Sequence, residues 1–162
     1  MARIGNAVTW VVDYYSQTSS YMTGLVIIGD VSTCVSGFIF YFSDGSSMTE
    51  GVSYNQTSSM LAFTNPSGLT EVNSYAGLII DLLEICNSYG VCVKAGKNGS
   101  IANYNITISS TWNITSFWGS FSNYNGITCL QSFGIYYTHA SPQTTTATSY
   151  FKTAETGIVF FS

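Results

Sequence analysis

Hydrophobic and polar residues alternate over short stretches along most of this chain, a pattern typical of half-buried β-strands. Three of these stretches resemble one another. Each contains an apolar residue, then a polar residue and a small or apolar one, and ends in an alternating apolar run. The stretches are residues 33–41, 79–85 and 128–136. Their polar positions are Ser36, Asp81 and Gln131, which are 45 and 50 residues apart. Because one unit of this size cannot bury a hydrophobic face alone, the repeat predicts three similar sheets around a common axis.

The middle stretch is ambiguous when it is taken alone. The apolar residues from Leu78 to Cys86 also suit a short buried helix. The two flanking stretches are strand-like, and they favour a strand here as well. Further strands are expected, from alternation and composition, at residues 25–28, 60–64, 90–94, 103–109 and 114–117.

The composition fits one folded domain with an unusually uncharged surface. The chain has 162 residues, of which 46% are hydrophobic and 15% aromatic. Charged residues make up only 7%, whereas about 25% is usual in soluble domains. So few charges protect a monomer poorly against association, and we expect attached glycans or a native assembly to supply that protection.

The charges also exclude two classes of partner. The net charge is −4, and the few cations form no cluster, which argues against nucleic acid and against an anionic membrane surface. No stretch reaches about 18 consecutive apolar residues, so no membrane insertion is predicted. The first ten residues lack the pattern of a signal peptide, and secretion is therefore inferred from other features.

Four cysteines predict two disulfide bonds. Cys86 and Cys92 flank a short turn, and symmetric pairing about that turn places them opposite each other, which suits a cross-strand bridge. Cys34 then pairs with Cys129. Zinc is not expected, because the single His139 is distant and only one cysteine pair is close in sequence. Four buried free thiols are the alternative.

Four asparagines stand in N-x-Ser/Thr sequons and are candidate glycosylation sites: Asn55, Asn98, Asn105 and Asn113. A chain this rich in Asn, Ser and Thr contains about three such sequons by chance, so their number alone establishes nothing. Together with the cysteines and the low charge, they favour an extracellular or cell-surface glycoprotein.

The C-terminal residues differ from the rest, and we divide the chain into a domain at 1–140 and a tail at 141–162. Residues 141–149 are rich in Ser and Thr, which is typical of a linker. The β-prone residues that follow include Ile158, Val159, Phe160 and Phe161. This segment either folds back as an edge strand or adds itself to the sheet edge of another subunit.

Several segments resemble the jacalin-like lectin domain family. Residues 37–45, 69–85 and 114–119 with 130–137 are similar to its early, central and terminal units, and the likeness covers residues 23–138. The resemblance implies an all-β fold, a β-prism of three Greek-key four-stranded sheets with a pseudo-threefold repeat. It also implies binding of mannose- or galactose-type sugars without a metal or cofactor.

The family's sugar site joins an N-terminal Gly-rich loop to a Gly-x-x-x-Asp loop. In this chain the binding Asp is replaced by Gln131, and the loop before it, Gly119 to Cys129, is about five residues longer than usual in the family. Near the N-terminus only Gly5 and Asn6 stand in place of a Gly pair. The carbohydrate-binding candidates are Trp118, Gly119, Asn123, Tyr124, Asn125 and Gln131, together with Gly77 and Asp81, which fit the Gly-x-x-x-Asp spacing in the middle unit. The alternatives are that the aromatic residues cap the core and that Gly77 and Asp81 are ordinary turn and surface residues.

No catalytic constellation is evident. His139 has no partner of complementary chemistry nearby in sequence, and the carboxylates are scattered. Two hypotheses follow: a non-catalytic, lectin-like module that binds glycans, or a glycosylated subunit that self-assembles into a homo-oligomer or fibre through its C-terminal strand.

Overall fold

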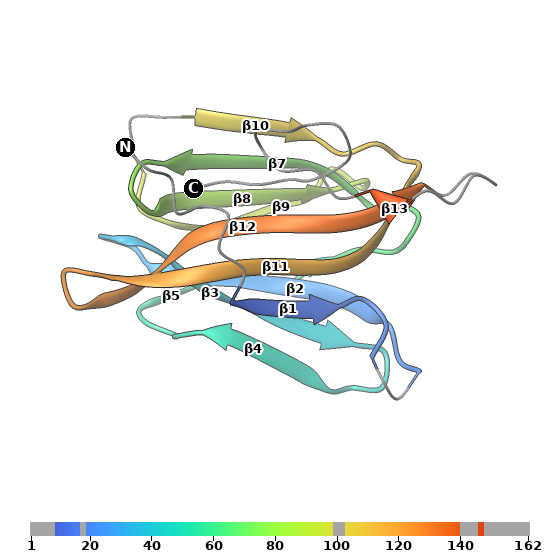
Figure 1. The fold of residues 1–162 in the computed structure, drawn as a ribbon, viewed down its shortest axis with the longest axis horizontal. Coiled ribbons are helices and arrows are strands. Elements are labelled where there is room, and N and C mark those ends of the chain that lie inside the picture. The colour runs from blue at the N-terminus through green and yellow to red at the C-terminus, as the bar shows by residue number, and fades with distance from the viewer. Residues whose placement is uncertain (1–8, 17–18, 99–102, 140–145, 148–162) are drawn as a thin grey trace.

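The computed structural model describes residues 9–16, 19–98, 103–139 and 146–147, and in them every regular element is a β-strand. Thirteen described strands form three sheets (Figure 1). The prediction of an all-β fold with three sheets is confirmed. The N-terminal Gly5 and Asn6 and the C-terminal Ile158–Phe161 lie outside the described residues.

Each sheet is named here by its central hairpin. The β11–β12 sheet has the order β1 (Trp10–Asp13), β11 (Trp112–Tyr124), β12 (Ile127–His139) and β13 (Thr146–Ala147). The β7–β8 sheet has the order β10 (Asn103–Thr107), β7 (Leu69–Ala76), β8 (Ile80–Asn87) and β9 (Cys92–Gly96). The β2–β3 sheet has the order β4 (Ser47–Gly51), β3 (Cys34–Phe42), β2 (Met22–Asp30) and β5 (Gln56–Thr57), and β6 (Leu61–Ala62) also pairs with β2. All pairings are antiparallel.

The three sheets share one spatial order, in which a fourth strand lies beside the first strand of the central hairpin. In the β7–β8 sheet, β10 returns to lie beside β7, outside the three consecutive strands. The β2–β3 sheet has five strands where four were predicted, because its returning strand is split. Between β5 and β6 the Ser58 hydroxyl accepts the N–H of Ile27 at 2.9 Å, in place of a regular ladder bond. A side chain thus bridges the interruption.

The three repeated stretches become equivalent strands. Residues 33–41, 79–85 and 128–136 fall on β3, β8 and β12, the second strand of each central hairpin. The helix alternative at Leu78 to Cys86 is not found, because Ile80–Asn87 is a strand. The repeat therefore corresponds to the repeated hairpin of the architecture.

The inner faces of the three sheets form one core. Phe38 from the β2–β3 sheet stacks on Phe133 from the β11–β12 sheet at 5.1 Å between ring centroids, and Phe117 lies 6.1 Å from Phe133. All three rings are fully buried. Burying one such side chain contributes about 1.5–3 kcal/mol, so these rings tie the β2–β3 and β11–β12 sheets together. The same core extends onto the β7–β8 sheet through Val72, Leu83 and Ile85.

The prediction of a long loop from Gly119 to Cys129 is wrong. β11 and β12 continue as strands up to a two-residue turn at Asn125 and Gly126, whose φ angles are 52° and 80°. Left-handed conformations at both central residues suit a type I′ hairpin turn, and Asn-Gly is the sequence that most favours it. The stretch at 141–149, predicted as a linker, contains β13, which pairs with Tyr137 and Thr138.

Candidate functional site

Three hairpin turns lie at one end of the molecule, on the left in Figure 1. They connect β2 to β3, β7 to β8 and β11 to β12. A small buried cluster of Cys34, Ile79 and Cys129, with Ile127 packed against it, contains a residue from each hairpin and joins them. We call this surface the hairpin end and define it by residues 30–33, 54–55, 77–79 and 123–126.

Both expected cysteine pairs are disulfide-bonded in the structure. Cys34 and Cys129 join the start of β3 to the start of β12, with their Cα atoms 5.8 Å apart. Cys86 and Cys92 lie directly opposite each other on β8 and β9. The four cysteines therefore include no free thiol, and the first bond fixes two of the three hairpins relative to each other.

One part of the hairpin end is a hydrogen-bonded turn around Asp30. The Ser32 hydroxyl and the Ser32 N–H donate to Asp30 Oδ1 at 2.6 and 2.9 Å. These hydrogen bonds, with that of the hydroxyl the stronger cause, lower the pKa of the Asp30 carboxyl below its ordinary value. Asn55 Nδ2 donates to Asp30 Oδ2 at 3.3 Å, and Asn55 Oδ1 accepts the N–H of Val31 at 2.9 Å. Asp30 is only 8% exposed, and these hydrogen bonds hold its ionised carboxylate in a fixed orientation.

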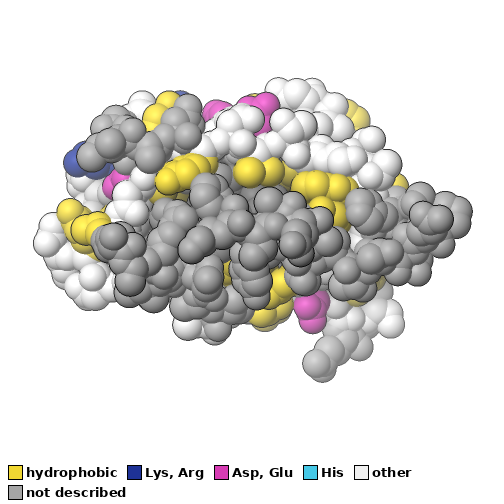
Figure 2. All heavy atoms as spheres, turned by 45° about the horizontal axis from the view of Figure 1, so that its top comes forward, with side chains coloured by type: hydrophobic (Ala, Val, Ile, Leu, Met, Phe, Trp, Pro, Cys, Tyr) yellow, Lys and Arg dark blue, Asp and Glu magenta, His cyan; other side chains and the backbone are white. Residues whose placement is uncertain are grey.

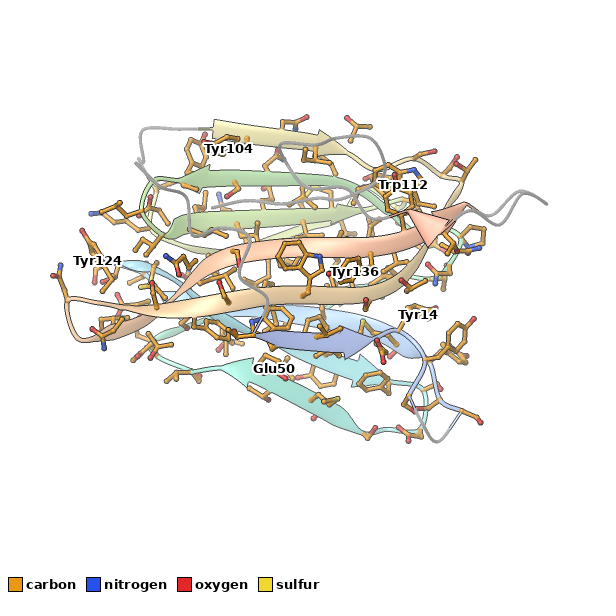
Figure 3. All side chains as sticks on the ribbon, in the orientation of Figure 1. Tyr14, Glu50, Tyr104, Trp112, Tyr124 and Tyr136 are labelled. Carbon is orange, nitrogen blue, oxygen red and sulfur yellow. A yellow bond between two sulfur atoms is a disulfide. The ribbon has the colours of Figure 1, made fainter. Side chains whose placement is uncertain are left out.

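The β11–β12 hairpin supplies another part of this surface. The N–H of Gly126 donates to Asn123 Oδ1 at 3.1 Å and locks the turn. The N–H of Thr128 donates to the Tyr54 hydroxyl at 2.9 Å, which holds the hairpin against the segment that carries Asn55. Tyr124 projects at the end of the molecule (Figure 3), and its side chain is 38% exposed. An aromatic face next to fixed polar groups suits a ligand with one apolar face and many hydroxyls.

The predicted site residues divide into those on this surface and those away from it. Asn123, Tyr124, Asn125 and Gly77 lie on the hairpin end, and all four are exposed. Asp81, half-buried, borders it, and its backbone oxygen accepts the N–H of Lys97.

Gln131 does not stand in a loop. Ser120 pairs with Ser132 and Phe121 with Leu130, so Gln131 is the extra residue of a bulge on β12, and it is half-buried.

Trp118 and Gly119 are buried in the middle of β11, and the structure does not place them on the hairpin end. Trp118 is fully buried. A Cβ at Gly119 would meet the ring of Trp10 at 2.6 Å, so this glycine serves close packing. Neither residue can contact a ligand at the hairpin end.

Sequence reasoning missed Asp30 and Tyr54 as parts of this surface. The signal for Asp30 was present, because Asp followed two residues later by Ser is typical of a side-chain-closed turn. Tyr54 carried no such signal, since its contact with Thr128 joins positions 74 residues apart.

The four candidate glycosylation asparagines all lie in the described part of the chain. Asn55, Asn98 and Asn105 are exposed, and Asn113 is half-buried. Exposure is compatible with modification at the first three, and their occupancy stays a prediction.

One group of potential metal ligands occurs within the described ranges: Glu84, Cys86 and Cys92. Its two sulfur atoms are bonded to each other, so they offer no thiolate, and the group does not form a metal centre. No described helix is long and apolar enough to cross a membrane.

Comparison with known proteins supports the fold rather than a family. No family model and no curated protein sequence matches the chain. Among solved structures, the chain is similar to a prostate-specific WGA16 glycoprotein lectin, with a TM-score of 0.60 and 10% sequence identity over 79% of this chain and 88% of that one. It is also similar to a lamprey immune protein, with a TM-score of 0.51 and 15% identity over 74% of this chain and 39% of that one. The chain therefore has a lectin-like β fold, and the jacalin family itself is not shown.

Proposed function

We propose that this protein is a non-catalytic, lectin-like module that binds glycans at the hairpin end. One observation carries the proposal. Tyr124 is exposed on the same surface as Asp30 and Asn55, which are hydrogen-bonded to each other, and the Cys34–Cys129 disulfide ties that surface together. The lectin-like fold supports it. Sugar hydroxyls both donate and accept, and they match an ionised carboxylate beside amide groups. The ring of Tyr124 offers the apolar face of a pyranose a stacking surface.

The chemistry of the surface supports binding rather than hydrolysis. A glycosidase needs a carboxylic acid with a raised pKa to protonate the leaving group. Hydrogen bonds from Ser32 lower the pKa of Asp30 instead. Burial raises the pKa of the Glu50 carboxyl, but Glu50 lies on β4, away from the hairpin end (Figure 3).

Replacing Tyr124 by alanine tests the proposal. Loss of the stacking ring is expected to weaken binding about tenfold, which corresponds to about 1.4 kcal/mol, in a titration with the glycans that the wild type retains from a panel. The matched control is Tyr89→Ala, which removes a tyrosine that is 80% exposed on the β8–β9 turn at the opposite end. Equal affinities of wild type and Tyr124→Ala, or a panel with no bound glycan, would sink the proposal.

We place the protein outside the cell or on its surface. Two disulfides persist in oxidising compartments and are uncommon in the cytosol. Exposed sequon asparagines are consistent with this location.

Self-assembly is a second proposed function, and one structural observation favours it. β4 lies at the edge of the β2–β3 sheet, and most of its residues are exposed. Such an edge presents backbone groups to which a strand from another subunit can pair, and few charges oppose the contact. The occupant we propose is Ile158–Phe161 of a second copy.

Particle size distinguishes assembly from a closed module. If the C-terminal segment links subunits, light scattering will find large particles for the full chain and monomers for a chain that ends at Ala147, which keeps β13. Monomers of both chains would exclude this second function and leave glycan binding unaffected.

A further inference from the structure

The outer face of the β7–β8 sheet carries a row of polar side chains that crosses all four strands. Asn105 lies opposite Asn73, Asn73 opposite Glu84, and Glu84 opposite Lys94. Directly opposite residues on antiparallel strands share a face. Their neighbours in sequence point to the core instead: Val72, Ile85 and Val93. The polar row therefore faces outward.

Hydrogen bonds hold the row in one arrangement. Asn73 Nδ2 donates to Glu71 Oε1 at 2.6 Å and to Glu84 Oε1 at 3.1 Å. Asn105 Nδ2 donates to Glu71 Oε1 at 3.2 Å and also to Asn73 Oδ1. Acceptors fixed before a ligand arrives lose little conformational entropy when it binds.

The row borders a shallow hollow whose lining is mostly polar. Its lining consists of Asn73, Tyr75, Leu82, Glu84, Lys94 and Asn98. Tyr75 lies opposite Leu82 in the sheet, and Leu82 is only 7% exposed although it is on the outer face. Figure 2 shows acidic side chains at the upper edge of the molecule, with uncharged polar atoms between them and a hydrophobic band below. Polar groups around one tyrosine and one leucine suit a small ligand that has many hydroxyls and one apolar face.

The charges select the kind of ligand. Glu71 and Glu84 repel a phosphate, sulfate or carboxylate, while Lys94 repels a cation. Hydroxyl groups accept from an ammonium and donate to a carboxylate, so they satisfy both signs at once.

We propose that this hollow is a second binding site, for an uncharged pyranose. It lies on the side of the prism, shares no residue with the hairpin end and does not depend on binding there. The sugar comes from one of two sources, a free glycan or a glycan attached to Asn98, which is one of the lining residues.

The test uses the full, disulfide-bonded chain without attached glycans, titrated with methyl α-mannoside, methyl β-galactoside and N-acetylglucosamine. We expect at least one sugar to shift the side-chain amide signals of Asn73 and Asn105, with a dissociation constant of about 1 mM. Asn73→Ala and Glu84→Gln are expected to weaken binding about tenfold, since each removes a fixed polar contact. The control Tyr124→Ala, at the hairpin end, is expected to leave these shifts unchanged.

The outcomes separate the two sites. The proposal would be overturned if amide shifts were absent both with all three free sugars and in a chain that carries a glycan at Asn98, or if both Asn73→Ala and Glu84→Gln bound sugar with wild-type affinity. Shifts of Asn73 that appear only when a glycan is attached at Asn98 support the hollow and identify the attached sugar as its occupant. If Tyr124→Ala abolished sugar binding while Asn73→Ala and Glu84→Gln did not, the result would support binding at the hairpin end and contradict binding in the hollow.

Discussion

Replacing Cys34 and Cys129 together by alanine is expected to lower the free energy of unfolding by about 4–5 kcal/mol. The disulfide closes a loop with a sequence separation of 95, so it removes much conformational entropy from the unfolded chain. Both cysteines are also fully buried, beside Ile79, and their removal leaves a gap where the three hairpins meet. Unfolding in guanidinium chloride, with intrinsic fluorescence as the signal, measures the loss.

The second disulfide is the matched control. Cys86 and Cys92 are six residues apart, and the same chain-entropy argument gives a loss of about 2 kcal/mol when both become alanine. This bond lies on the outer face of the β7–β8 sheet, away from the three-hairpin cluster. Equal losses for the two double variants would contradict the role given to Cys34–Cys129.

A side chain at Gly134 is expected to destabilise the β11–β12 sheet strongly. A Cβ there would lie 2.1 Å from ring atoms of Trp118, because the indole rests directly on the glycine backbone. Gly134 and Trp118 are opposite each other in the pairing of β11 and β12. Gly134→Ala must displace a fully buried indole, which costs about 1–3 kcal/mol, and Gly134→Val more.

Gly77→Ala is the control for that substitution. A Cβ at Gly77 meets no atom within 4 Å, so the free energy of unfolding is expected to change by less than about 0.5 kcal/mol. Chemical unfolding compares the two variants, and the indole N–H signal of Trp118 in an NMR spectrum reports whether that ring has moved. A Gly134→Ala protein as stable as Gly77→Ala would show that the indole is not confined in this way.

The fold was predictable from sequence because it repeats. The alternating pattern of residues 33–41 recurs at 128–136, and both became the second strand of a hairpin. The length of β11 was not predicted, because Phe117, Trp118 and Gly119 are buried in succession and break the alternation of a half-buried strand. A strand that is buried on both faces lacks the alternation of hydrophobic and polar residues from which a half-buried strand is predicted.

The candidate sites were predicted only in part, because some of their residues come together only through the register of paired strands. Asn123, Tyr124 and Asn125 were found because they surround a strong turn signal. The polar row was not, since Asn105, Asn73 and Glu84 meet only after two separate strand pairings align them. A shift of one residue in either pairing would turn one of these side chains toward the core, and no local pattern fixes that choice.

The most direct test of the central claim is a map of backbone amide chemical shifts with the glycan that binds most tightly in the panel. The account predicts that the largest changes fall at residues 30–33, 54–55 and 123–126, whether or not residues on the β7–β8 sheet also respond. Changes absent from those three segments, or concentrated at the opposite end around residues 88–91, would contradict it.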